Sequence, residues 1–442
     1  MLSALALVTT DTAEFFPHAD FSFFNVHTET TSQAIAAFLL MDCVPDMDLL
    51  RRRVDEELRR SFRRFTRVVV SDPKLRWAQP AHFDVADHIT LRRLPGITDL
   101  ASLMKEASRE FSLPLDMSRP LWQMTVISGP EDANPVTGIL FKLHHSLTDG
   151  LGALEALYAF CGDQVKPARA GNDGDEEAVS EWGPARNTWD KIAIGVKCAR
   201  QILFETLSPP IRSPLNGPNS TQRTGCLVRL PRAELRRIGI QLGGSLHDTL
   251  MTLLAGALAR FHTRTGYPVG DMRAIVPVSI RRSDQKEEMS NLITAVGIRM
   301  PIALPSPKER LNAIRSDLDR VKNDGTVAAY RFLSSVLVRL PRKVHRLSFE
   351  RMFLNTNFLC TIIPGARFMK TLAGAKIELI SGFAANNRNH ASSFTFVTYC
   401  REVSLIALVD PTVVKDLAGL EACIRESWEE LRGLSVPIEG AA

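Results

Sequence analysis

The residues of this sequence that could do chemistry are gathered in one short run, His144-His145-Ser146-Leu147-Thr148-Asp149-Gly150. Histidine can accept a proton near neutral pH, because its ordinary pKa is about 6.5. The carboxylate of Asp149 can hold a turn through hydrogen bonds or a basic partner, and Gly150 permits a positive φ or a close approach of another group. The run therefore predicts one imidazole that works as a proton acceptor on a constrained turn.

Apolar segments on both sides place this run at a turn between a strand and a helix. Residues 123–127 and 138–143 are short apolar runs bracketed by turn signals, and residues 151–160 have helical periodicity. A strand that ends in histidine and turns into a helix presents an imidazole at the edge of a sheet, where a cleft can form. A pair of histidines at the end of a strand is more often a surface turn or a core contact. The Asp-Gly at this spacing, together with the segments described below, favours a catalytic histidine.

A metal site is the alternative chemistry for two histidines. Adjacent residues at the end of a strand point to opposite faces, and no third ligand lies at a spacing typical of zinc. The seven cysteines are scattered and never form a Cys-x-x-Cys pair, which also argues against a disulfide framework. We therefore expect no metal ion, and the reducing cytoplasm is the expected location.

The overall composition excludes several other classes of protein. The formal net charge is only +5, from 54 basic and 49 acidic side chains, so nucleic acid is not an expected partner. No apolar stretch of about 18 residues is free of charge, and no basic segment precedes the apolar run at the start. The sequence predicts neither a transmembrane helix nor a secretory signal.

The length of 442 residues favours two domains. Residues 1–165 form the half with the histidine motif, 166–213 an acidic, glycine- and proline-rich linker, and 214–442 the second half. Helices and strands are mixed in both halves, which predicts an α/β fold. The further expected elements are helices at 47–66, 247–264, 307–322 and 418–431, and strands at 68–70, 273–279, 293–300, 394–399 and 403–409.

The histidine motif resembles the His-His-x-x-x-Asp-Gly signature of the chloramphenicol-acetyltransferase-like, CoA-dependent acyltransferases, a superfamily that includes the condensation domains of peptide synthetases. Four more segments resemble motifs of the wax ester synthase/diacylglycerol acyltransferase family, in the right order along nearly the whole chain. They are PLDMSRPLW at 114–122, PLNG at 214–217, AIVPVSIR at 274–281 and LAGA at 372–375.

This resemblance implies two similar α/β halves with a substrate tunnel between them. It implies that His145 is the general base, that Asp149 and Gly150 shape the loop, and that His144 has a supporting role. No serine or cysteine has a recognisable nucleophile motif, so the acceptor would attack the acyl thioester directly in a ternary complex. No cofactor is expected besides the thioester donor itself, which is acyl-CoA or an acylated carrier protein.

Four further residues are expected to contact substrate. Asn216 and Gly217 belong to the PLNG segment, and Asp248 lies at the start of the buried helix of the second half. Arg281 ends a strand, where it can meet Asp149 or a CoA phosphate, although an ordinary surface arginine is equally consistent. The sequence departs from the family pattern at His247 and at 361–366 (TIIPGA), so the acceptor side is the part of the site that differs.

Three functional hypotheses follow. The first is a CoA-dependent O-acyltransferase that makes a wax ester or an acylglycerol. The second is a stand-alone condensation-type enzyme of secondary metabolism that takes its acyl group from an acyl carrier protein and acylates an alcohol or an amine. The third, a protein that only binds acyl groups or scaffolds partners, is disfavoured by the intact His145 and Asp149.

One surface segment has two interpretations. Residues 331–351 contain six basic side chains and one acidic one, with apolar residues between them. Such a segment is either a peripheral contact with a membrane or lipid droplet, strengthened by anionic lipids, or a solvated helical face.

Overall fold

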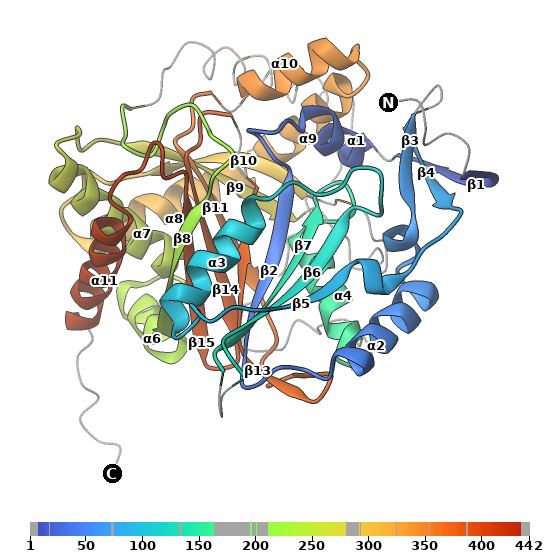
Figure 1. The fold of residues 1–442 in the computed structure, drawn as a ribbon. Helices are drawn as coiled ribbons and strands as arrows, with labels where there is room; N and C mark the ends of the chain where they lie inside the picture. The colour runs from blue at the N-terminus through green and yellow to red at the C-terminus, as the bar shows by residue number, and fades with distance from the viewer. Residues whose placement is uncertain are drawn as a thin grey trace.

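The computed structural model describes residues 8–16, 18–71, 75–131, 135–162, 195–196, 200, 211–279, 291, 293–323, 325–352, 354–385 and 388–434. Within these ranges the chain forms two six-stranded sheets and a three-stranded sheet, with helices packed against them (Figure 1). The expected α/β class is confirmed. The expected linker, 166–213, lies almost entirely outside the described residues.

The first large sheet has the strand order β12-β13-β2-β7-β6-β5. Its strands are β2 (Ala34–Met41), β5 (Ile89–Arg93), β6 (Trp122–Ser128), β7 (Thr137–His144), β12 (Thr371–Leu372) and β13 (Ala375–Phe383). Every residue of β2 and β7 is buried, which explains why both strands are continuous apolar runs without alternation.

Helices cover both faces of this sheet. On one face, Leu39 of β2 packs in a core with α2 (Met47–Arg60) and α4 (Gly150–Phe160). On the other face, Phe38 packs in a core with α3 (Leu100–Ser112). Because the sheet is covered on both sides, the end of β7 lies inside the molecule.

The second large sheet has the strand order β10-β9-β11-β14-β15-β8. Its strands are β8 (Thr224–Pro231), β9 (Met272–Ser279), β10 (Ile293–Met300), β11 (Phe358–Pro364), β14 (Ser392–Tyr399) and β15 (Glu402–Val409). The helices α6 (Arg232–Leu242), α7 (Leu246–Thr265), α8 (Pro307–Asn323) and α11 (Leu417–Gly433) pack around it (Figure 1).

Two strands of the second half of the sequence belong to the first sheet. β13 pairs antiparallel with β2, with Ile380 opposite Leu39, and β12 continues the sheet beyond it. The apolar pattern of a strand does not say which neighbour it joins, so this exchange is visible only in the structure. The division into halves at 1–165 and 214–442 stays a prediction. The strand pairing shows in addition that residues 371–383 complete the first sheet.

Two smaller groups of elements lie at the edges of the molecule, a three-stranded sheet at the right and three helices at the top of the view in Figure 1. The three-stranded sheet consists of β1 (Val8–Phe15), β3 (Val68–Ser71) and β4 (Leu75–Pro80). The helices α1 (His18–Val26), α9 (Thr326–Leu337) and α10 (Arg342–Met352) lie together at the top of the view in Figure 1, where α1 contacts α10.

Most of the expected elements are present within one or two residues of their predicted ends. The helix expected at 47–66 is the exception, because α2 ends at Arg60 and a separate 3₁₀ turn, η2, covers Arg63–Thr66. The apolar spacing continues across this break, since Phe62 and Phe65 are both buried. No helix within the described part of the chain is long and apolar enough to cross a membrane.

Candidate active site

The histidine motif forms the turn between β7 and α4. β7 ends at His144, and Asp149 is the N-cap of α4, with its Oδ1 accepting a hydrogen bond of 3.0 Å from the backbone N–H of Gly152. Asp149 is only 1% exposed. A buried carboxylate that caps a helix holds the turn in one conformation, because it satisfies an amide that the helix leaves unpaired.

Gly150 does not adopt a positive φ, and its lack of a side chain serves a close approach instead. A Cβ atom at this position would lie 3.0 Å from Cδ1 of Ile363 on β11, which is tighter than ordinary side-chain contact. The glycines with positive φ in the described residues lie elsewhere. Gly150 therefore lets the motif approach the second sheet closely.

The His145 side chain lines a cavity of about 430 Å³ whose wall is mostly apolar. The motif contributes His145, Asp149 and Gly150 to this wall. The remaining wall comes from both large sheets and from the helices α1, α9 and α10. It includes Ala36, Ala37, Leu337, Phe349, Thr361, Ile363, Gly382 and Val397. An apolar cavity with a few polar, titratable groups at its wall, here His145, Asp149 and His345, is typical of a site for a small hydrophobic substrate.

The hydrogen bonds of Asn291 determine which nitrogen of His145 carries the proton. The Asn291 amide nitrogen donates to the backbone oxygen of His145 at 2.6 Å and to Oδ1 of Asp20 at 2.7 Å. The Asn291 amide oxygen lies 2.8 Å from His145 Nδ1 and can only accept, so Nδ1 is the protonated nitrogen. The neutral imidazole therefore keeps Nε2 as its free, basic nitrogen.

Burial lowers the pKa of His145 below its ordinary value of 6.5, while the charge of Asp149 and the hydrogen bonds at the ring oppose this shift. The imidazole is therefore neutral at pH 7. The site can accept a proton at Nε2, and the nearby Asp149 carboxylate stabilises the imidazolium that results.

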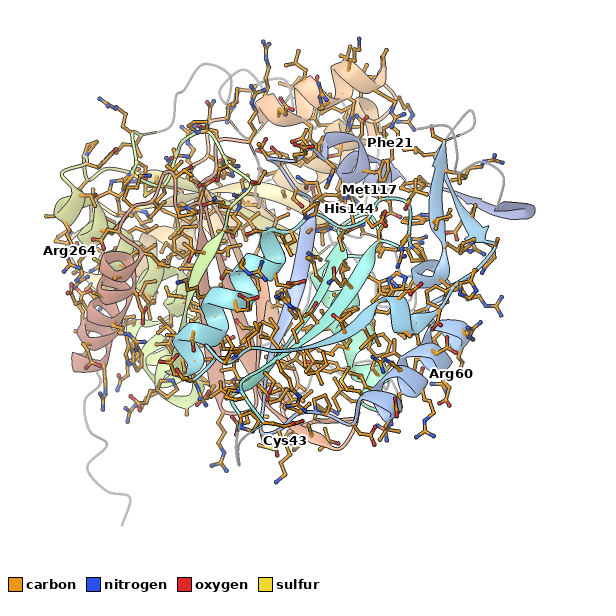
Figure 2. The ribbon with its side chains drawn as sticks, in the orientation of Figure 1. Phe21, Cys43, Arg60, Met117, His144 and Arg264 are labelled. Atoms are coloured by element: carbon orange, nitrogen blue, oxygen red, sulfur yellow. The ribbon has the colours of Figure 1, made fainter. Side chains whose placement is uncertain are left out.

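His144 has the opposite tautomer and does not line the cavity. Its Nδ1 accepts a hydrogen bond of 3.1 Å from the backbone N–H of Ser146, so its proton is on Nε2, which lies 3.2 Å from Nδ1 of His27. Burial, together with the nearby imidazoles, keeps the pKa of His144 well below 6.5. Figure 2 shows His144 beside α1, whose Phe24 ring lies 5.8 Å from the imidazole. These contacts place His144 within the core, and its supporting role stays a prediction.

Asn216 and Gly217 lie outside the wall of this cavity. The Asn216 amide nitrogen donates to the backbone oxygens of Asn357 and Asn389 at 2.9 and 3.0 Å. A Cβ atom on Gly217 would lie 2.9 Å from Cγ1 of Val413. The PLNG segment thus joins two loops of the second half, and its role in substrate binding stays a prediction.

Asp248 also lies away from the described cavity wall. Its carboxylate accepts hydrogen bonds from the backbone and hydroxyl of Ser245 at 2.8 and 2.9 Å and so forms the capping box of α7. Arg281 lies outside the described residues. Substrate binding by both residues stays a prediction.

The described residues contain no group of three or more histidine, cysteine, aspartate or glutamate side chains that could hold a metal ion. The two motif histidines do not point to a common site, because His144 is hydrogen-bonded in the core and His145 lines the cavity.

Sequence reasoning missed three residues around His145. Asn291 and Asp20 form its hydrogen-bonded support, and the Phe23 ring stacks on the imidazole with centroids 3.9 Å apart. These residues lie more than 100 positions from His145, and no motif spacing connects them to it.

Two mixed sheets that both contribute to the cavity lined by His145 form a fold similar to that of condensation domains. The chain belongs to the wax ester synthase/diacylglycerol acyltransferase family: residues 20–181 match the catalytic domain of that family and residues 289–432 match its C-terminal domain.

Similar proteins support this assignment. A protein of Mycobacterium tuberculosis, provisionally named a diacylglycerol O-acyltransferase, is 27% identical over 387 residues, which cover 78% of this chain and 77% of that protein. The solved wax ester synthase/diacylglycerol acyltransferase from Marinobacter aquaeolei VT8 has a TM-score of 0.69 at 18% identity, covering 95% of this chain and all of that one.

The fold is also similar to that of a condensation domain. The starter condensation domain of rhizomide synthetase, solved with C8-CoA, has a TM-score of 0.59 at 13% identity and covers 96% of this chain and 95% of its own.

Proposed function

We propose that this acyltransferase moves a fatty acyl group from a CoA thioester to a hydroxyl acceptor and makes a wax ester or an acylglycerol. The observation that carries the proposal is the free Nε2 of a neutral, partly buried His145 at the wall of an apolar cavity. The apolar wall suits an acyl chain, and the unprotonated nitrogen suits a base that activates an alcohol.

In the proposed reaction, the acceptor hydroxyl gives its proton to His145 Nε2 while its oxygen attacks the thioester carbonyl carbon. The tetrahedral intermediate then collapses, the C–S bond breaks, and the departing CoA thiolate takes the proton back from the imidazolium. Asp149 stabilises the imidazolium through its charge. Direct attack requires donor and acceptor to be bound together, which brings both reacting groups to one base.

A covalent acyl-enzyme is not required by the residues present. No cysteine lies on the described cavity wall, and burial raises the pKa of the Cys360 thiol to about 12, so that this thiol is protonated at neutral pH. The C8-CoA bound to the rhizomide synthetase domain supports the entry of an acyl-CoA into this type of fold.

The second candidate function is condensation with a carrier-protein donor, and the likeness to condensation domains is the observation that favours it. Purified protein is mixed with radiolabelled palmitoyl-CoA or with palmitoyl acyl carrier protein, and with a panel of fatty alcohols, diacylglycerol and amines. Turnover of free palmitoyl-CoA with an alcohol supports the first function. Turnover that needs the carrier protein supports the second, and no transfer in any combination contradicts both.

We propose in addition that the protein works in the cytoplasm and contacts an anionic lipid surface through α9 and α10. Phe332, Val344 and Leu347 are about half exposed on these helices. The exposed basic side chains among them are Arg331, Arg339, Arg342, Lys343, Arg346 and Arg351. The one acidic residue of the segment, Glu350, already forms an ion pair of 2.8 Å with Arg388. Exposed apolar side chains surrounded by cations match the surface of an anionic membrane.

Flotation with vesicles tests this contact. The protein is expected to float with phosphatidylglycerol vesicles and to do so less with neutral phosphatidylcholine vesicles, and Leu347→Gln together with Lys343→Gln is expected to weaken flotation. A matched pair on another surface, Ile240→Gln with Arg237→Gln, is expected to leave it unchanged. Equal flotation with both lipids would contradict the preference for anionic lipid. An unaffected Leu347/Lys343 variant would assign the segment to solvent.

A further inference from the structure

We propose that Asp20 is a positioning residue for His145. Its carboxylate orients the amide of Asn291, and the amide in turn fixes the imidazole tautomer that leaves Nε2 free. The inference rests on the proposed function of His145 as the base, and it assigns a task to a residue of α1 that is distant in the sequence from the histidine motif.

Asp20 is completely buried in the first turn of α1. Its Oδ2 accepts a hydrogen bond of 2.9 Å from the guanidinium of Arg64, on the η2 turn, and its Oδ1 accepts one of 2.7 Å from the amide nitrogen of Asn291. Three segments that are distant in the sequence therefore meet at one carboxylate, and the chain of contacts continues from Asn291 to His145.

The direction of these hydrogen bonds is set by chemistry. A carboxylate can only accept, so the Asn291 amide must present its nitrogen to Asp20. Its oxygen then faces Nδ1 of His145, which must carry the proton. The backbone oxygen of His145 accepts from the same amide nitrogen at 2.6 Å and favours the same orientation. A reversed amide would place oxygen against oxygen at both contacts.

The buried charge is costly, which argues against a role in stability alone. Burial raises the pKa of Asp20 to about 6, although Arg64 and the hydrogen bonds from Asn291 act against this shift. Apolar side chains of similar volume are often as good as a buried ion pair, or better, for stability. A positioning task accounts for the carboxylate at this place.

The variant Asp20→Asn tests the relay because it keeps the size of the side chain and removes one acceptor. The amide that replaces the Asp20 carboxylate has a single oxygen for two donors, Arg64 and Asn291. When this oxygen accepts from Arg64, the NH₂ group of the same amide faces Asn291 and favours a reversed Asn291 amide. The reversed amide donates to His145 Nδ1, so that the proton moves to Nε2 and the free base is lost.

The experiment combines kinetics with ¹⁵N NMR of histidine-labelled protein. In the native protein the His145 signal, assigned by its absence in His145→Ala, is expected to report a proton on Nδ1. In Asp20→Asn it is expected to report a proton on Nε2, with kcat lower by about a hundredfold or more and KM for acyl-CoA nearly unchanged, since loss of the correct tautomer removes the base.

A matched control is Asp410→Asn. Asp410 is also completely buried and pairs with Arg223 at 3.1 Å, but it does not line the cavity. This variant is expected to lose a similar amount of thermal stability and to keep the native kcat and the native His145 tautomer. The comparison separates positioning from the loss of a buried ion pair.

A rescue variant makes the test independent of how well Asp20→Asn folds. In Asp20→Asn/Arg64→Met the competing donor is gone, so the single amide oxygen can accept from Asn291 again. Both the tautomer and kcat are expected to return toward the native values, and no charge is left unpaired at Asp20.

Three results would overturn the proposal: a native tautomer in Asp20→Asn, a native kcat in that variant, or the absence of rescue by Arg64→Met. The tautomer is read without substrate. If the native protein transfers no acyl group and Asp20→Asn still changes the His145 tautomer, the proposed function is rejected and the positioning role is kept.

Discussion

The Phe23 ring stacks face to face on the imidazole of His145, with centroids 3.9 Å apart and planes only 9° apart. The contact restricts rotation of the imidazole, because tilting the ring would break the stack. Asn291 fixes the position of Nδ1 through a hydrogen bond of 2.8 Å. The orientation of Nε2 is therefore determined by two residues outside the histidine motif.

His145→Ala is expected to lower kcat by about a hundred- to ten-thousandfold, because that is the usual loss when a general base is removed. Binding of acyl-CoA should change little, and the fall in melting temperature should be limited to the loss of the Phe23 stack and the Asn291 hydrogen bond at the cavity wall. Steady-state kinetics and a thermal melt measure both quantities, and the exposed His82→Ala serves as the control. Native turnover in His145→Ala, or an accumulating acyl-enzyme, would contradict the mechanism.

The pH dependence of kcat/KM is expected to follow the base. Burial places the pKa of His145 below 6.5, so the reactive neutral form persists at mildly acidic pH and is lost only as the pH falls through this lowered value. The rate should therefore be flat at neutral pH and fall on the acid side with an apparent pKa below 6.5. An acid limb centred above pH 7 would show that His145 is not the titrating base.

His144→Ala is expected to cost more stability than rate. The side chain is completely buried and hydrogen-bonded to Ser146 and His27, so its removal leaves buried polar partners at a cost of about 1–3 kcal/mol. A melt should show a larger fall in Tm than His145→Ala does, with kcat reduced less. A stable His144→Ala protein with kcat as low as that of His145→Ala would contradict the supporting role of His144 and assign it to the chemistry.

His144 is also expected to make stability depend on pH. Its pKa is lowered in the folded protein, so below about pH 6.5 the unfolded chain binds a proton that the folded protein does not, and stability falls as the pH decreases. The loss of Tm between pH 7.5 and 5.5 should be smaller in His144→Ala than in the native protein. An unchanged or larger loss would contradict the assigned direction.

Two substitutions at Asp149 separate its cap from its charge. Asn is as good an N-cap as Asp, so Asp149→Asn should keep most of the stability and lower kcat, because the imidazolium loses its nearby negative charge. Asp149→Ala loses the cap as well, at a further cost of about 0.5–2 kcal/mol. Chemical denaturation and kinetics measure the two effects, and a fully stable and active Asp149→Ala protein would contradict both roles.

Activity is expected to survive chelation. The proposed reaction needs a base and two bound substrates, and the described residues hold no cluster of metal ligands. The rate after dialysis against EDTA should equal the rate before it. A loss that zinc or magnesium restores would require a metal in the mechanism.

The sequence by itself determined the histidine motif, its position between a strand and a helix, and most of the secondary structure. These features are local, since they depend on apolar periodicity and on residues within a few positions of each other. The capping by Asp149 and the opposite directions of His144 and His145 follow from the same local geometry.

Only the tertiary structure decided what surrounds His145. Asn291 and Phe23 reach the imidazole, and Asp20 reaches Asn291, from segments more than 100 residues away from His145. β13 crosses into the first sheet to complete the cavity wall. Long-range pairing and side-chain orientation depend on how all elements pack at once, and a single sequence contains no local pattern for them. The choice between the two tautomers of His145 is therefore a property of the packed molecule, because it depends on which way one distant amide points.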